Sequence, residues 1–518
     1  MPSRRVSEST LPGEKQRHAH SLPEDPEGLG DSKVSSMIIP SNDKESKEQD
    51  EQTQDDDAFK VVLEPADDPK NLPVFRKWLV LLVVCCGSLC ATCASSMAAS
   101  AEGGVSETFH VGREVSILGV SLFVLGLGIG PLLIGPLSEV YGRNIVYRAS
   151  YILFFAFSWP VAFAPHISVY LIFRFLTGFC SSAFLSVAGG SVGDLFDNHK
   201  IGTPMAVYTI SPFIGPVLGP LLSGFINQNT TWRWTFRVLV AWTFATTIAL
   251  FIIVPETYEP FILKCKAKRL RRETGNQRYW SPLDRCEVSM AQAIIRSCYV
   301  PFELLMLDSM ALLLDLWSAL LLGILYLTFQ AFPIIFGRGH HFSMEFTGLT
   351  FIGMGIGMIV GVLIQPQFNK QIANIAKAND GRAPLEARLI PGMWGAIMVP
   401  ASLYWLAFTT YPGIHWIVPI IASVPFATGV LFCFNAVFTY TVTAYRPIAA
   451  SAMAANTFVR TSFAAAFPLF AGQMYNRLGT VGATALLAGL TTIAAPLPFI
   501  FYRIGARLRA KSRFTTPA

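Results

Sequence analysis

The stretch SPFIGPVLGPLLSGF runs from Ser211 to Phe225 inside a long apolar segment. Its small residues recur every four positions, and prolines follow them one place behind: Ser211, Gly215, Gly219 and Ser223, then Pro212, Pro216 and Pro220. In lipid, a stripe of small residues on one side of a helix lets a neighbouring helix approach closely. Each proline removes a backbone hydrogen bond and weakens the helix locally. The stretch predicts a membrane helix that packs tightly and bends; the alternative is a packing face alone.

The rest of the chain is equally apolar. Of its 518 residues, 52% are hydrophobic and 14% charged, and the mean hydropathy is +0.45. This composition predicts an all-α polytopic membrane protein. The sequence carries no disulfide framework, zinc spacing, Walker sequence or nucleophile–base–acid motif. We therefore expect no metal, cofactor or nucleic-acid partner, and no enzyme activity.

From Trp78 onward, apolar spans of bilayer-crossing length alternate with short polar links. Twelve spans are predicted, six on each side of a basic loop: 78–100, 115–136, 146–164, 168–190, 203–226 and 235–254, then 310–336, 347–365, 389–408, 414–438, 449–471 and 479–502. Residues 300–309 are expected to form an amphipathic lead-in to the seventh span. The predicted division is a six-helix half at 71–255, a loop at 256–300, a second half at 301–503 and a basic tail at 504–518.

Charge predicts how the chain is oriented. Residues 1–70 hold 9 Lys/Arg against 17 Asp/Glu, and such a polar segment is expected to be a disordered tail. The loop 256–300 carries a dense basic cluster at Lys264, Lys266, Lys268, Arg269, Arg271, Arg272 and Arg278. Basic residues beside membrane spans favour the cytoplasmic side. We expect a multi-pass protein of the plasma membrane with both termini in the cytoplasm.

The link after the second span reads GPLSEVYGRNIVYR, from Gly135 to Arg148. Glycines at helix ends, an acid and two bases suit a tight turn that forms charge-assisted bonds to a neighbouring helix end. The residues concerned are Gly135, Glu139, Gly142, Arg143 and Arg148. The alternative is a basic turn that serves membrane orientation only.

Three charged residues lie inside predicted spans: Arg174, Asp315 and Arg460. A charge at such depth is costly unless it faces a partner or water, so each should point into the bundle. Arg174 is a candidate for proton transfer or for a fixed ion pair. Asp315 is a candidate proton carrier, whereas Asp315 and Arg460 could also be structural and paired with each other or with other groups.

Polar and aromatic residues inside the spans are candidates for contact with a substrate: Tyr208, Tyr326, Gln330, Phe332, Asn435 and Tyr440. Aromatic side chains with few fixed charges suit a large, apolar and in some cases cationic molecule. Most aromatics in such a chain face lipid or packing partners instead.

These stretches resemble the major facilitator superfamily, and in particular its fungal drug:proton antiporter branch. The 135–148 link resembles the loop signature GxLaDrxGrkxxl, with Glu139 in place of Asp and Asn144 in place of Lys. The 211–225 stretch resembles the antiporter motif G(x)3GPxxGG and departs from it at Ser211 and Pro220. Further similar stretches are DDPKNLP (67–73), PETYEPFILKCKAKRLRRETG (255–275), HWIVPII (415–421) and AAFPLFAGQMYNRLG (465–479). Gln330 and Thr443 stand where relatives often carry acids.

The resemblance implies two six-helix halves around a central cavity, with alternating access. It also implies a proton-coupled exporter of lipophilic drugs, toxins or fungal secondary metabolites that works as a monomer. In the family, the loop signature helps latch the two halves in one state, and the arginine matching Arg174 is implicated in proton transfer. A polyamine or nutrient carrier on the same fold and a receptor or scaffold that does not transport are the alternatives.

Overall fold

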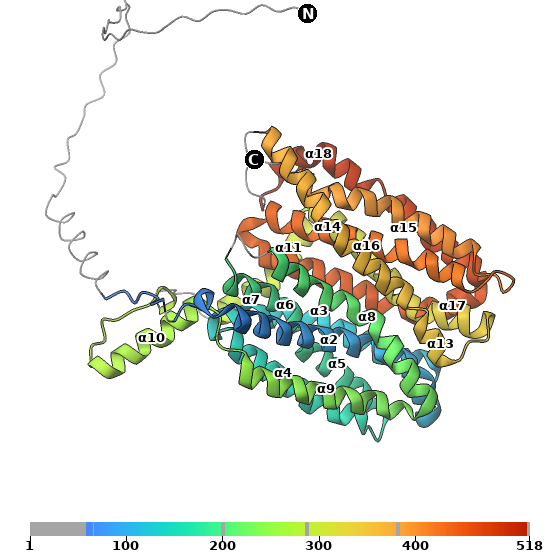
Figure 1. The fold of residues 1–518 in the computed structure, drawn as a ribbon, viewed down its shortest axis with the longest axis horizontal. Coiled ribbons are helices and arrows are strands. Elements are labelled where there is room, and N and C mark those ends of the chain that lie inside the picture. The colour runs from blue at the N-terminus through green and yellow to red at the C-terminus, as the bar shows by residue number, and fades with distance from the viewer. Residues whose placement is uncertain (1–58, 66, 198–201, 285–289, 380–383, 515–518) are drawn as a thin grey trace, which may run out of the picture. The chain divides into compact units, whose positions relative to one another are not determined.

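The computed structural model describes residues 59–65, 67–197, 202–284, 290–379 and 384–514. Within these ranges every regular element is a helix, and the apolar helices run beside one another (Figure 1). The first half comprises α2 (Val74–Phe109), α3 (Arg113–Tyr141), α4 (Arg143–Ala162), α5 (Ile167–Ser181), α6 (Ala183–Ser186), α7 (Ala188–Leu195), α8 (Gly202–Asn229) and α9 (Trp232–Ile253). Before and after it lie η1 (Pro69–Asn71), α10 (Glu259–Thr274), η2 (Pro282–Asp284) and α11 (Met290–Leu307).

The second half begins with α12 (Ser309–Phe332), which a π-helical turn, η3 (Pro333–Gly339), extends. It continues with α13 (Met344–Leu349), α14 (Ile352–Ala378), η4 (Leu385–Leu389), α15 (Ile390–Phe408), α16 (Ile417–Ala444), η5 (Arg446–Ile448), α17 (Ala449–Ala494) and α18 (Leu497–Lys511).

Eleven stretches of the described residues are long and apolar enough to cross a membrane. The last, Ala449–Ala510, contains two crossings because the backbone leaves the helix at Gly479, where φ is 72°. The hydroxyls of Tyr475 and Thr484 lie 3.0 Å apart across this turn, whereas nine residues of continuous helix would separate them by about 14 Å. The twelve predicted spans are therefore present in the described part of the chain, six before α10 and six after α11.

The predicted fourth span, 168–190, lies within one crossing, Ile167–Leu195, whose helix is interrupted at Ser182 and Val187. It is divided among α5, α6 and α7, which together reach residue 195. At the first break the Ser182 hydroxyl donates to the Phe179 carbonyl, and the Ser186 hydroxyl donates to the Ser182 carbonyl. Serine side chains that bond nearby carbonyls compete with the helical ladder and bend helices. Hydropathy alone does not register such a break.

Packing within each half is dominated by α2 with α8 and by α12 with α17, while α3 with α17 and α8 with α13 make the most extensive contacts between halves. One end of the bundle carries the Gly142 turn and α10, and we call it the basic end. The other carries the turns near Val111 and His340, and we call it the opposite end.

The segment just before η1 packs against the loop between the halves. The backbone N–H of Val61 donates to the Trp280 carbonyl at 3.0 Å, and that of Trp280 donates to the Phe59 carbonyl at 3.1 Å. Lys266 Nζ lies 2.7 Å from Glu64 Oε1, and this hydrogen bond raises the pKa of the lysine. The last residues of the predicted tail are thus packed on α10; residues 1–58 lie outside the described part of the chain. We call this contact the clasp.

Candidate functional site

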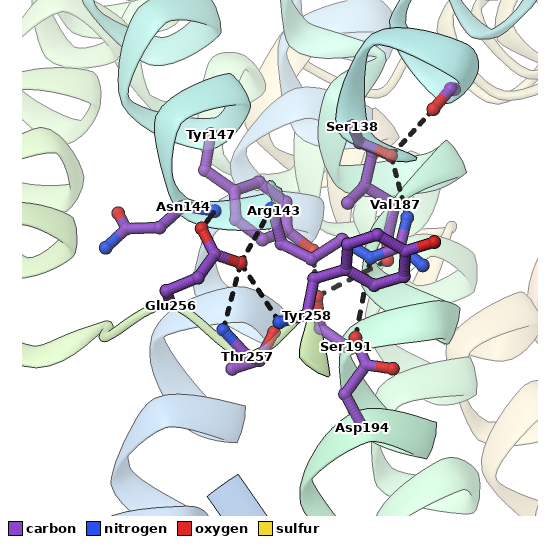
Figure 2. Close-up of polar contacts among 11 residues, drawn as sticks. Ser138, Arg143, Asn144, Tyr147, Val187, Ser191, Asp194, Glu256, Thr257 and Tyr258 are labelled. Carbon is purple, nitrogen blue, oxygen red and sulfur yellow. Dashed lines mark hydrogen bonds and ion pairs between the residues drawn. The ribbon is translucent and has the colours of Figure 1, made fainter. Parts of the chain in front are cut away.

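The Gly142 turn is built around the carboxylate of Glu256, which follows α9 (Figure 2). Glu256 Oε1 accepts from the backbone N–H of Arg143 at 2.8 Å, and Oε2 accepts from that of Asn144 at 3.1 Å. A carboxylate at the first N–H groups of a helix complements the helix dipole. Gly142 has a φ of 86°, and a Cβ there would lie 2.4 Å from Glu256 Oε2, so the turn requires glycine.

The Arg143 side chain extends this cluster to a third helix. Its Nη1 donates to Ser138 Oγ at 2.7 Å, its Nε lies 3.4 Å from Asp194 Oδ2, and its guanidinium stacks 4.7 Å from the Tyr258 ring centre. Figure 2 shows these side chains converging from α3, α4, α7 and the segment after α9. These partners belong to the first half and to the start of the loop that follows it, so in this conformation the cluster contains no contact with the second half among the described residues. Its expected role as a latch between halves stays a prediction.

The acids of this cluster differ from the one expected in the motif. Glu139 is exposed and has no hydrogen bond or ion pair to any residue that the structure describes. A Cβ added to Gly135 would meet no neighbouring atom, and Arg148 Nη2 donates to the Phe251 carbonyl at 3.2 Å. Asp194 and Glu256 were not singled out from the sequence. The only available signal for Glu256 was its place in the PETYEP stretch beside the basic loop.

The small-residue stripe of α8 packs on α2. A Cβ added to Gly215 would lie 1.9 Å from Thr92 Oγ1, and at Gly219 the placed Cβ lies 1.9 Å from Ser96 Oγ. Cys93 Sγ also donates to the Gly215 carbonyl at 3.3 Å. These distances leave no room for a side chain, as the stripe predicted.

The prolines of α8 leave carbonyls without their usual helical donors, and one of these is satisfied locally. Pro212 has no N–H to give to the Tyr208 carbonyl, and the Ser211 hydroxyl donates to that carbonyl instead at 2.9 Å. The face of α8 beside the prolines meets the second half. Phe213 stacks on Phe434 with ring centres 5.6 Å apart, and a Cβ at Gly348 would lie 2.6 Å from the Pro220 carbonyl. This helix therefore contacts α2 on one side and the second half on the other.

Arg174 on α5 is buried, with 2% of its surface exposed. Its Nε donates to the Gly119 carbonyl at 2.8 Å, and its Nη2 donates to the Ala94 carbonyl at 3.1 Å. The guanidinium stacks 4.4 Å from the Phe123 ring centre. Among the described residues no acid lies within ion-pair distance of Arg174, and its hydrogen bonds go to backbone carbonyls instead of to the acid that the ion-pair alternative requires. Arg174 joins α5 to α2 and α3.

Asp315 on α12 is buried beside Asn456 of α17. Asn456 Nδ2 donates to Asp315 Oδ1 and to Ser318 Oγ, both at 2.8 Å. Asp315 Oδ2 has no hydrogen-bond partner among the residues that the structure describes. Arg460, one turn further along α17, forms no ion pair with Asp315, and its guanidinium stacks 4.8 Å from the Phe438 ring centre. If Asp315 has a structural role, it acts through its contact with Asn456 and not through an ion pair with Arg460.

Arg460 Nε also lacks an acceptor in the described part of the chain. An ionised carboxylate and a guanidinium with unused hydrogen-bonding capacity are costly to bury, and such groups mark functional positions inside membrane proteins. The site thus contains an acid and a base that lie near each other without being bonded.

The substrate-contact candidates fall into two groups. Tyr326 and Gln330 contact the first half: Tyr326 and Ser95 hydroxyls are 2.8 Å apart, and Gln330 Nε2 donates to Glu102 Oε1 at 2.6 Å. Phe332 is buried against Phe336 and Phe351. Their contact with a substrate stays a prediction.

Two other candidates each form a hydrogen bond within their own half. The Tyr208 hydroxyl donates to the Phe184 carbonyl at 3.1 Å within the first half. The Tyr440 hydroxyl lies 3.5 Å from Met310 Sδ within the second half. Asn435 is half-buried on α16. A cavity of about 600 Å³ is lined by α14, α15 and α18, with Gln371, Trp394 and Arg503 on its wall. It is an open groove on the surface of the second half, where Trp394 is 57% exposed, and is not the expected central cavity.

Comparisons with known proteins agree with this architecture. A family model described as Major Facilitator Superfamily matches residues 84–468. A protein named efflux pump atB from Aspergillus terreus is 48% identical over 394 residues, covering 75% of this chain and 83% of that protein. A probable drug/proton antiporter, YHK8 from Saccharomyces cerevisiae, is 41% identical over 455 residues, covering 88% of each chain. Among solved structures, the xylose transporter XylE from E. coli aligns with a TM-score of 0.60 at 16% identity, over 83% of this chain and 98% of that one.

Proposed function

The chain belongs to the major facilitator superfamily, and we propose that it is an efflux transporter that exchanges protons for lipophilic small molecules. The proposed substrates are drugs, toxins or fungal secondary metabolites. The relatives named as efflux pumps and drug/proton antiporters support export and proton coupling. Their similarity to this chain extends over most of its length, which includes both halves of the bundle.

The proposed orientation places the basic end in the cytoplasm of a cell whose plasma membrane holds the protein. The exposed side chains of Lys268, Arg269 and Arg272 on α10 support this assignment, because basic residues beside membrane spans favour the cytoplasmic side. Both termini then lie inside, and the opposite end faces outward.

One observation carries the proposal of proton coupling. Asp315 is buried at the α12–α17 contact with one oxygen unbonded, and Arg460 lies nearby without an acceptor for its Nε. When the halves rock, water can reach this carboxylate from one side and then from the other. In the proposed cycle, the inward-open protein takes its substrate from the cytoplasm or the inner leaflet. The outward-open protein releases the substrate and loads a proton.

The proposal is tested by measuring accumulation of fluorescent lipophilic cations, azoles, polyamines and aromatic polyketide toxins in pump-deficient yeast that expresses the chain. We expect lower accumulation of at least one compound, reversed by a protonophore. Higher accumulation than in cells without the chain would show an importer. Unchanged accumulation of the whole panel, with the protein at the cell surface, would contradict export of these classes and favour a receptor or scaffold.

A further inference from the structure

At the opposite end of the bundle, three side chains from both halves form a continuous chain of hydrogen bonds. Gln330 on α12 donates its Nε2–H to Glu102 Oε1 of α2 at 2.6 Å. Arg113 at the start of α3 donates its Nη2–H to Gln330 Oε1 at 3.0 Å. The amide of one half thus bridges an acid and a base of the other. The sequence placed Gln330 among the substrate contacts and assigned Glu102 and Arg113 no role.

Two members of the bridge, Gln330 and Glu102, are buried, whereas Arg113 is exposed at the end of the bundle, and the amide has one orientation. Gln330 is 2% exposed and Glu102 is 7% exposed. A guanidinium only donates hydrogen bonds and an ionised carboxylate only accepts them, so the amide oxygen must face Arg113 and its nitrogen must face Glu102. The amide lies between a positive and a negative group, and both of its bonds are charge-assisted.

Neighbouring contacts close the same end. Gln228 Oε1, at the end of α8, accepts from the backbone N–H of Met344 at the start of α13, at 3.1 Å. A Cβ at Gly224 would lie 2.8 Å from the Met344 carbonyl, so the two helices touch through backbone. The three-residue bridge is the charged part of a wider contact between the halves at this end.

We propose that Glu102, Arg113 and Gln330 are the outer lock of the transporter: their bridge holds the outer side closed and must break before an exported molecule can leave. Gln330 is a positioning residue, because it joins two groups that do not bond each other directly. If the halves separate at this end, Gln330 leaves both partners and water replaces it. The inference rests on the proposed function, since it takes alternating access and the orientation of the bundle from there.

The test measures opening without using a transported compound. Thr461→Cys places a thiol on α17 where α3 meets it, because a Cβ at Gly128 would touch the Thr461 side chain. Thr461 Oγ1 bonds only carbonyls of its own helix, so this change cuts no bond between halves. Intact cells are treated with a membrane-impermeant maleimide, and the chain that retains Thr461 gives the background.

The Thr461→Cys chain is the parent in this experiment. Adding Gln330→Leu to it removes the bridge and replaces glutamine by a side chain of similar size. We expect severalfold more labelling of the introduced thiol from outside than in the parent. Gln365→Leu is the matched control, because Gln365 bonds only Asn369 of its own helix, and its labelling should equal that of the parent. Labelling of the Gln330→Leu chain at the parent level would overturn the proposal.

Gln330→Glu provides a second variant in case the leucine chain does not fold. It sets two carboxylates against each other, with Arg113 on α3 and Tyr170 on α5 as the charged or titratable groups facing Glu102. Two carboxylates at such a distance repel each other when both are ionised, and protonation of one of them in acid restores a hydrogen bond between them. Labelling should exceed the parent at neutral external pH and fall toward it in acid. Parent-level labelling at every pH would count against the lock.

The two proposals can fail separately. Export by the yeast assay together with unchanged labelling would remove the lock and leave the transporter. Increased labelling without export of any compound would keep the lock and remove the proposed substrates.

Discussion

Arg174 and Arg460 are two arginines inside the bundle, one in each half, and they differ in what surrounds them. Arg174 is fully buried and gives hydrogen bonds to the carbonyls of Gly119 and Ala94. Arg460 is half-buried, and its Nε has no acceptor in the described part of the chain. Backbone carbonyls neither gain nor lose protons, whereas the nearby acid Asp315 can do both. A buried charge held by backbone is therefore a structural support, and one held loosely beside an acid can change partners.

The largest expected effect comes from Arg174→Met, which keeps the length of the side chain but removes its donors. The variant loses two hydrogen bonds from a charged donor that join α5 to α2 and α3, at about 1.5–3 kcal/mol each. We expect a marked fall in the melting temperature of the purified protein and in its yield. Arg233→Met is the control, because Arg233 donates to one carbonyl, that of Ala164, near the end of the bundle. Equal melting temperatures for the two variants would break the comparison.

Asp315→Asn is expected to abolish proton-driven export while leaving the melting temperature near that of the parent. The amide keeps the shape of the side chain but cannot carry a proton in and out of the bundle. Asp308→Asn, at the start of the same helix, is the control, since Asp308 caps α12 by accepting from the N–H groups of Met310 and Ala311 and asparagine caps equally well. Unchanged export by the Asp315→Asn protein at several pH values would remove Asp315 from the role of carrier.

The smallest expected effect is that of Asn456→Ala. This change removes one donor to Asp315 and one to Ser318, and a net hydrogen bond contributes about 0.5–1.5 kcal/mol, or roughly two- to tenfold in a rate. We expect initial export rates to fall within that range and the pH dependence of export to shift. Asn369→Ala on α14 serves for comparison and should export normally. A loss of folding in the Asn456 variant would instead assign the Asp–Asn contact a structural role like that of Arg174.

The sequence predicts those features of the fold that depend on local composition. Bilayer thickness sets the length of each apolar span, so all twelve are visible in hydropathy. The α8 stripe predicts close packing because glycine and serine are small wherever they occur, and the structure confirms it at Gly215 and Gly219. Gly142 is likewise explained by its own backbone conformation, because its φ of 86° favours glycine.

The partners of the charged residues could not be predicted in this way. Arg143 meets Asp194 and Glu256, and Gln330 meets Glu102, across separations of 51 to 228 residues. Hydropathy reports how deep a residue lies but not which helix it faces. For the same reason the sequence left open whether Asp315 pairs with Arg460 or with another group, because the rotation of α17 decides which of its side chains faces α12. The division of the fourth span depends on serine hydroxyls, which hydropathy averages away.

The clasp between residues 59–65 and α10 has a consequence for biosynthesis. The partners Lys60 and Trp280 stand on either side of all six helices of the first half, so the early segment emerges from the ribosome long before the residue it pairs with. At roughly 5–20 residues per second this wait lasts about ten to forty seconds. During that time α2 to α9 enter the membrane one after another, before residues 59–65 can contact α10. Closure of the clasp therefore requires that all six helices of the first half have already been made.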